Sequence, residues 1–128
     1  MMQALLAVAA GGMFGAVLRY AVNVAAMKLA GPGFPLGTMI VNIAGSFAMG
    51  ALVALMAHSW SVSQEVRLFL AVGLLGSFTT FSTFSLDVYT LYERQAYGLL
   101  AFYALGSFAL SLFGLVLGLA VVRRVLVG

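Results

Sequence analysis

Residues 73–87, GLLGSFTTFSTFSLD, carry the densest group of polar side chains in an otherwise apolar chain. Gly76 is followed there by six hydroxyl-bearing residues: Ser77, Thr79, Thr80, Ser82, Thr83 and Ser85. Within a bilayer, polar groups and non-helical backbone must be hydrogen-bonded inside the protein or face a cavity that holds water or ions. The stretch therefore predicts a functional site at a broken helix.

A second group of polar residues lies upstream, where Thr38, Asn42 and Ser46 recur every four residues and so share one helix face. Asn42 matters most, because an unpaired amide in hydrocarbon costs several kcal/mol. It either joins two helices by hydrogen bonds or donates its N–H groups to a ligand. Both readings fit the sequence.

The same four-residue step places Tyr103, Ser107 and Ser111 on one face near the C-terminus. At the helical rise these hydroxyls form a stripe about 12 Å long. Serine hydroxyls often bond back to the preceding helical turn. The stripe is therefore either the polar lining of a passage or a set of locally satisfied hydroxyls.

Phe81 and Phe84 are three residues apart, and each is flanked by Ser or Thr. Two phenylalanines at helical spacing are usually core residues. A phenyl ring also has a positive edge, however, so a ring turned edge-on toward a polar passage attracts an anion without a fixed charge. Arg19, inside an apolar stretch, either attracts anions to a vestibule or anchors the chain at the membrane interface.

Composition excludes several functional classes. Of 128 residues, 64% are hydrophobic and only 7% charged, which is too little charge to cover a water-facing surface. The acids are Glu65, Asp87 and Glu93, and they form no dyad with His58 or with one another. Cysteine is absent, so thiolate metal sites are excluded. We predict that the chain is not an enzyme, and a net charge of +3 calls for no nucleic-acid partner.

The elements that position these side chains are four apolar stretches, at about residues 5–27, 36–57, 66–91 and 97–122. Each is long enough to cross a bilayer, which needs roughly 20 residues. We predict an all-α membrane protein, a single domain over residues 1–128, with its third helix broken near the middle. Small residues at Gly11, Gly15, Gly114 and Gly118 allow close approach of helices, within the bundle or between subunits.

Positive charges are balanced between the two ends of such a bundle. One end collects Arg67, Arg123 and Arg124, and the other collects Arg19, Lys28 and Arg94. Lys and Arg near span ends normally set orientation, so a chain without a bias is expected to insert both ways. Dual topology predicts an antiparallel homodimer. Four helices of this length are too few to enclose a pathway, and a second copy would supply the missing wall.

Three motifs in this order, GGMFGAVLRY, GTMIVNIAGS and GLLGSFTTFSTFS, resemble the Fluc/CrcB family of fluoride channels over nearly the whole chain. The resemblance implies a passive, selective channel that exports fluoride across the bacterial cytoplasmic membrane, with two pores in each antiparallel dimer. It implies a pore lined by Phe81, Phe84, Asn42 and the stripe Tyr103, Ser107 and Ser111, with Thr38 and Ser82 in support. Arg19 matches the arginine of the family's first motif and is expected in a vestibule.

The resemblance also implies one structural sodium ion at the dimer centre, held by the backbone carbonyls of Gly76 and Thr79. Two positions depart from the family pattern. Asp87 stands where members often have Glu, and Ser77 stands where some have a second Gly. Two rival functions stay open: a small multidrug-type proton-coupled transporter, which normally uses a membrane carboxylate, and a non-transporting assembly subunit.

Overall fold

The computed structural model describes all 128 residues as helices joined by short turns. The elements are α1 (Met2–Ala30), α2 (Leu36–His58), α3 (Gln64–Arg67), η1 (Leu68–Leu75), α4 (Gly76–Phe78), α5 (Phe81–Glu93) and α6 (Tyr97–Val127). Four helical units are long and apolar enough to cross a membrane: Met2–Ala30, Leu36–His58, Gln64–Glu93 and Tyr97–Val127. The prediction of an all-helical chain with four such spans is confirmed.

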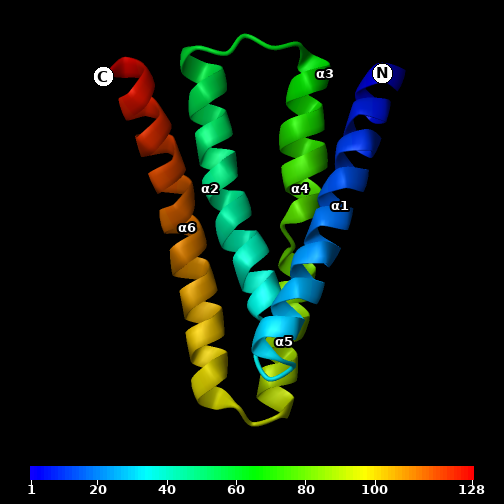
Figure 1. Ribbon diagram of the computed structural model, residues 1–128, viewed down its shortest axis with the longest axis vertical. Helices are drawn as coiled ribbons and strands as arrows, with labels where there is room; N and C mark the ends of the chain where they lie inside the picture. Colours follow the sequence, from blue (N-terminus) through cyan, green and yellow to red (C-terminus); the bar gives the residue numbers. More distant parts are fainter.

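Short turns place the four spans side by side and alternate their direction. Both termini lie at one end of the bundle with the turn between α2 and α3, and the α1–α2 and α5–α6 turns lie at the other end (Figure 1). Gly31 ends α1 with φ 73°, a value that favours glycine, and Pro35 precedes α2. Ser63 caps α3 by accepting a hydrogen bond from Val66 N at 3.2 Å.

The third span changes its helical geometry along its length. The π-helix η1 leads into the single turn α4, and the backbone is then extended at Thr79 (ψ 160°) and Thr80 (φ −156°) before α5 begins. Thr80 caps α5, since its Oγ1 accepts a hydrogen bond from Thr83 N at 3.2 Å. Gly76 has helical dihedral angles, φ −61° and ψ −34°, so the non-helical residues lie three and four positions after it.

Glycines bring the helices into two closely packed pairs, α1 with η1 and α4, and α2 with α6. A Cβ atom on Gly11 would collide with Phe69 O, and one on Gly118 would collide with Phe47 O. These glycines therefore pack within one chain, where helix backbones touch directly. The two pairs diverge toward the end that holds the termini (Figure 1).

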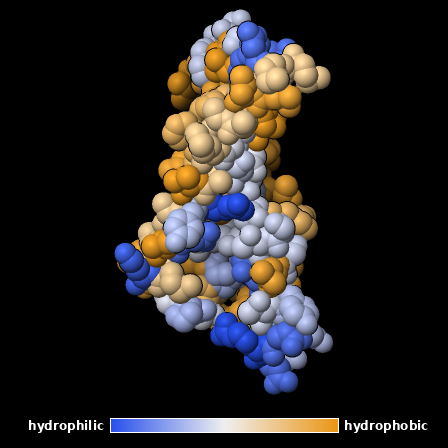
Figure 2. All heavy atoms as spheres, turned by 90° about the vertical axis from the view of Figure 1, so that its right-hand side faces the viewer, coloured by the Kyte–Doolittle hydropathy of each residue, from blue (hydrophilic) through white to orange (hydrophobic).

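The outer surface is that of a membrane protein rather than a water-soluble bundle. Only 17 of 128 residues are buried, and large side chains such as Phe14, Leu105 and Val116 are exposed. Apolar residues cover much of the upper part of the molecule in Figure 2, whereas hydrophilic ones gather at both ends and in the lower half. This distribution suits a hydrocarbon surrounding between two aqueous ends.

Candidate functional site

Asn42 on α2 is hydrogen-bonded to the extended backbone of Thr80. Its Oδ1 accepts from Thr80 N at 2.7 Å, and its Nδ2 donates to Thr80 O at 3.0 Å. The amide thus joins two spans, which is one of the two readings of this residue in the sequence. Because an amide nitrogen carries two hydrogens, Asn42 keeps one N–H that this pair of bonds does not use.

A groove of about 330 Å³ runs along the bundle beside this contact, between α2, the extended backbone and α6. Its lining combines hydroxyl and amide groups with phenyl rings: Asn42, Ser46, Thr79, Thr80, Phe81, Phe84, Ser107, Phe108, Ser111 and Leu112. The structure therefore brings together five residues that the sequence proposed for one site, namely Asn42, Phe81, Phe84, Ser107 and Ser111. They come from three different spans.

Ser107 is the only residue whose side chain has a buried polar atom with no hydrogen-bond partner. It is 3% exposed and lies on the groove wall. Ser85 and Thr90 bond back to carbonyls of the preceding turn, at 3.0 and 2.9 Å, but the Ser107 hydroxyl does not. Buried polar groups are almost always paired, so an orphaned hydroxyl in a groove calls for a ligand or water.

Three aromatic rings form a continuous row from the groove into the bundle. The ring centres of Phe81 and Phe84 are 5.6 Å apart, and those of Phe84 and Tyr103 are 5.3 Å apart. Phe81, 78% exposed, stands at the outer end, and Tyr103, fully buried, at the inner end. The Tyr103 hydroxyl donates to Asp87 Oδ2 at 2.8 Å, so it is paired with a carboxylate rather than free.

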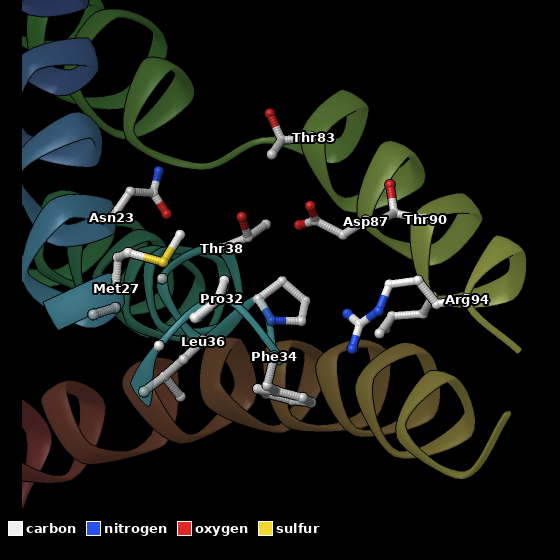
Figure 3. Close-up of a pocket in the computed structure, with 15 residues that line it drawn as sticks. Asn23, Met27, Pro32, Phe34, Leu36, Thr38, Thr83, Asp87, Thr90 and Arg94 are labelled. Carbon is white, nitrogen blue, oxygen red and sulfur yellow. The ribbon is translucent and has the colours of Figure 1, made fainter. Parts of the chain in front are cut away.

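Beyond this row lies a second cavity of about 280 Å³, next to the α1–α2 turn. Thr38, Thr83 and Asp87 are among its lining residues, and Figure 3 shows the Asp87 carboxylate pointing toward Thr38. Tyr103 links the two hollows, because its ring contacts Phe84 of the groove and its hydroxyl contacts Asp87 of the cavity. The helix α5 therefore contributes residues to both hollows, Phe81 and Phe84 to the groove and Thr83, Asp87 and Thr90 to the cavity.

Four residues of the predicted site line neither hollow: Ser82, Arg19, Tyr103 and Gly76. Ser82 is exposed, and its Oγ lies 3.3 Å from Thr80 Oγ1. Arg19 is half-buried on α1, outside the lining of both the groove and the cavity.

The extended backbone changes the hydrogen bonding of two carbonyl oxygens. In a continuous helix Gly76 O would accept from Thr80 N, but that N–H donates to Asn42. Likewise Thr79 O would accept from Thr83 N, which donates instead to the Thr80 hydroxyl. Both carbonyls lose their helical partners, and Gly76 lies at the exposed surface of the chain.

Four residues that line the second cavity were not among the residues predicted for the pore: Asn23, Thr83, Thr90 and Arg94. The sequence pattern indicates three of them, because polar residues 83, 87, 90 and 94 have the spacing of one helix face. Asn23 lies four residues after Arg19 in an apolar span, and a polar side chain in such a span is reason enough to consider it for the site.

The family model described as CrcB-like protein, Camphor Resistance (CrcB), matches residues 6–119. The chain belongs to the CrcB family. The predicted resemblance to Fluc/CrcB proteins is therefore confirmed. The family consists of ion channels and not of enzymes. The prediction that the chain is not an enzyme is therefore confirmed.

Relatives with high identity cover almost the entire chain. A protein of Agrobacterium fabrum named "Fluoride-specific ion channel FluC" is 55% identical over 117 residues, covering 91% of this chain and 94% of the relative. Proteins with the same name from Cereibacter sphaeroides and Rhodospirillum centenum are each 54% identical, over 123 and 122 residues, covering 96% and 95% of this chain and 97% of each relative.

Proposed function

We propose that this protein is a passive fluoride channel of the bacterial cytoplasmic membrane, with the groove and the second cavity as parts of its ion pathway. The observation that carries the proposal is the buried Ser107 hydroxyl, which lacks a partner in a groove shared with Asn42 and Phe84. The names of the relatives, all fluoride-specific channels, indicate which ion to expect there.

The groove has the chemistry that fluoride requires. This small anion holds its hydration water tightly, so a pore must offer strong donors in exchange and still release the ion. Ser107 and Ser111 supply hydroxyls, Asn42 supplies its remaining N–H, and the rings of Phe81 and Phe84 supply positive edges. No lysine or arginine lines the groove, and a fixed cation at such close range would hold fluoride too firmly.

A second copy of the chain is proposed to complete the pathway as an antiparallel homodimer. The groove is open along one side, and Phe81 and Phe108 on its rim are 78% and 68% exposed. The even distribution of Lys and Arg between the two ends favours insertion in both orientations. Twofold symmetry then gives two equivalent pores, each with matched residues from both subunits.

A structural sodium ion at the dimer centre is proposed for the carbonyls of Gly76 and Thr79. Both oxygens lack their helical partners, and carbonyl oxygens at a broken helix suit a hard cation. Two symmetry-related pairs would give four oxygen ligands. Equilibrium binding of radioactive sodium to the purified dimer is expected at one ion per dimer, and an absence of binding would refute this part of the proposal.

Ion efflux from liposomes containing the purified protein tests the channel proposal. We expect fluoride to leave rapidly down its gradient and chloride to stay, without a proton gradient. Ser107→Ala should reduce fluoride efflux at least severalfold while the protein elutes as the wild type does, with Ser59→Ala in the α2–α3 connection as the matched control. Equal chloride and fluoride efflux, or a strict need for a proton gradient, would contradict the proposal.

A further inference from the structure

Arg94 lines the second cavity and brings a positive charge to it. Residues Thr83, Asp87, Thr90 and Arg94 share one face of the helical segment and line the same cavity. Arg94 follows the last residue of α5, at the end of the bundle where the α1–α2 turn also lies. Its guanidinium extends back toward the lining residues rather than out from the bundle (Figure 3).

A hydrogen bond holds this cation at the mouth of the cavity. Arg94 Nη1 donates to Gly33 O at 3.0 Å, which connects the α5–α6 turn to the α1–α2 turn across 61 residues of sequence. The acceptor is a neutral carbonyl, so the positive charge is retained. A guanidinium has five N–H donors, and four stay available for an approaching anion.

Asp87 is the one other ionisable group in the cavity lining. Its Oδ2 accepts a hydrogen bond from the Tyr103 hydroxyl, which is a neutral donor, and not from Arg94. A carboxylate on the pathway repels fluoride, and its charge must be offset for anions to gather at this end. Arg94 is the cation placed to do so, since Arg19 does not line the cavity.

We propose that Arg94 is the residue that draws fluoride to this end of the pathway, where its guanidinium, anchored on Gly33 O, offsets the negative charge of Asp87. This inference rests on the proposed channel function. The guanidinium acts through its field and not by tight binding, because it stands at the rim of the cavity and is exposed.

Fluoride efflux measured at low and high ionic strength tests this role. At about 10 mM salt, Arg94→Gln should lower efflux roughly threefold, the Boltzmann factor for one unit charge about 6 Å away in water. At about 1 M salt the difference should vanish, because the Debye length falls from about 30 Å to about 3 Å. Arg94→Lys keeps the charge and should match the wild type at both salt concentrations.

Lys28→Gln is the matched control, because Lys28 lies in the last turn of α1 at the same end and does not line the cavity. An equal loss in Lys28→Gln, or a loss in Arg94→Gln that persists at high salt, would overturn the inference. Wild-type efflux in Arg94→Gln at low salt would overturn this inference alone. An absence of fluoride efflux from the unmodified protein would overturn the proposed function and this inference with it.

Discussion

Asn42 satisfies both backbone groups of Thr80, accepting from its N–H at 2.7 Å and donating to its carbonyl at 3.0 Å. This single side chain replaces the hydrogen bonds that Thr80 gives up by leaving the helix. A polar residue 38 positions away in sequence therefore stabilises the extended backbone between α4 and α5. The two chain neighbours of Thr80, Thr79 and Phe81, are both groove residues.

Replacing Asn42 with Ala should destabilise the fold as well as impair conduction. Two partly buried backbone groups of Thr80 lose their partners, and each unsatisfied group costs about 1–3 kcal/mol. Unfolding by SDS in mixed micelles, followed by the fluorescence of the single tryptophan, Trp60, measures the loss. Ser46→Ala, one helical turn along the same groove, should unfold like the wild type; an equally stable Asn42→Ala would contradict this account.

Phe81→Ile and Phe84→Ile should both reduce fluoride efflux sharply, because isoleucine fills space but has no positive ring edge. Their effects on folding should differ. Phe81 is exposed in the single chain, so Phe81→Ile should change the unfolding free energy by less than about 0.5 kcal/mol. Phe84 packs against the buried cluster of Met39, Leu91 and Tyr103 and should cost more.

Efflux and SDS unfolding of the same two variants provide the measurements, and size-exclusion chromatography shows whether each variant elutes as the wild type does. Unaltered efflux in both variants would show that the rings serve only in packing.

Gly50→Ala and Gly118→Ala should separate α2 from α6. An added Cβ on Gly50 would collide with Leu115 O and one on Gly118 with Phe47 O, and neither atom belongs to a flexible side chain. We expect each substitution to lower the unfolding free energy by about 1–3 kcal/mol. Gly98→Ala is the matched control, since no atom lies within 4 Å of its added Cβ. Stability equal to the wild type in Gly50→Ala would disprove this packing.

Topology can be biased by adding three Lys residues to the C-terminus. If the protein works as an antiparallel dimer, most copies will then insert in one orientation, and fluoride export should fall severalfold. Co-expression with a copy that carries three Lys residues in the 31–35 turn should restore it. Fluoride export from cells, followed with a fluoride electrode, is the measurement. Full activity of a single fixed orientation would refute the antiparallel arrangement.

The sequence by itself determined the four spans, because their apolar runs exceed the length that a bilayer requires and charged residues are confined mostly to their ends. It also determined the family, through motifs spread over the whole chain. The set of polar candidates followed from the rarity of such residues in apolar helices. These properties are local, so neighbouring residues suffice to define them.

Only the tertiary structure decided which polar groups are paired and which are free. Asn42 pairs with Thr80, and Tyr103 pairs with Asp87, whereas Ser107 has no partner. All three looked alike in sequence, as polar residues at helical spacing. Pairing depends on how α2, α5 and α6 approach one another, and helix faces meet according to side-chain shape and glycine contacts far apart in the chain.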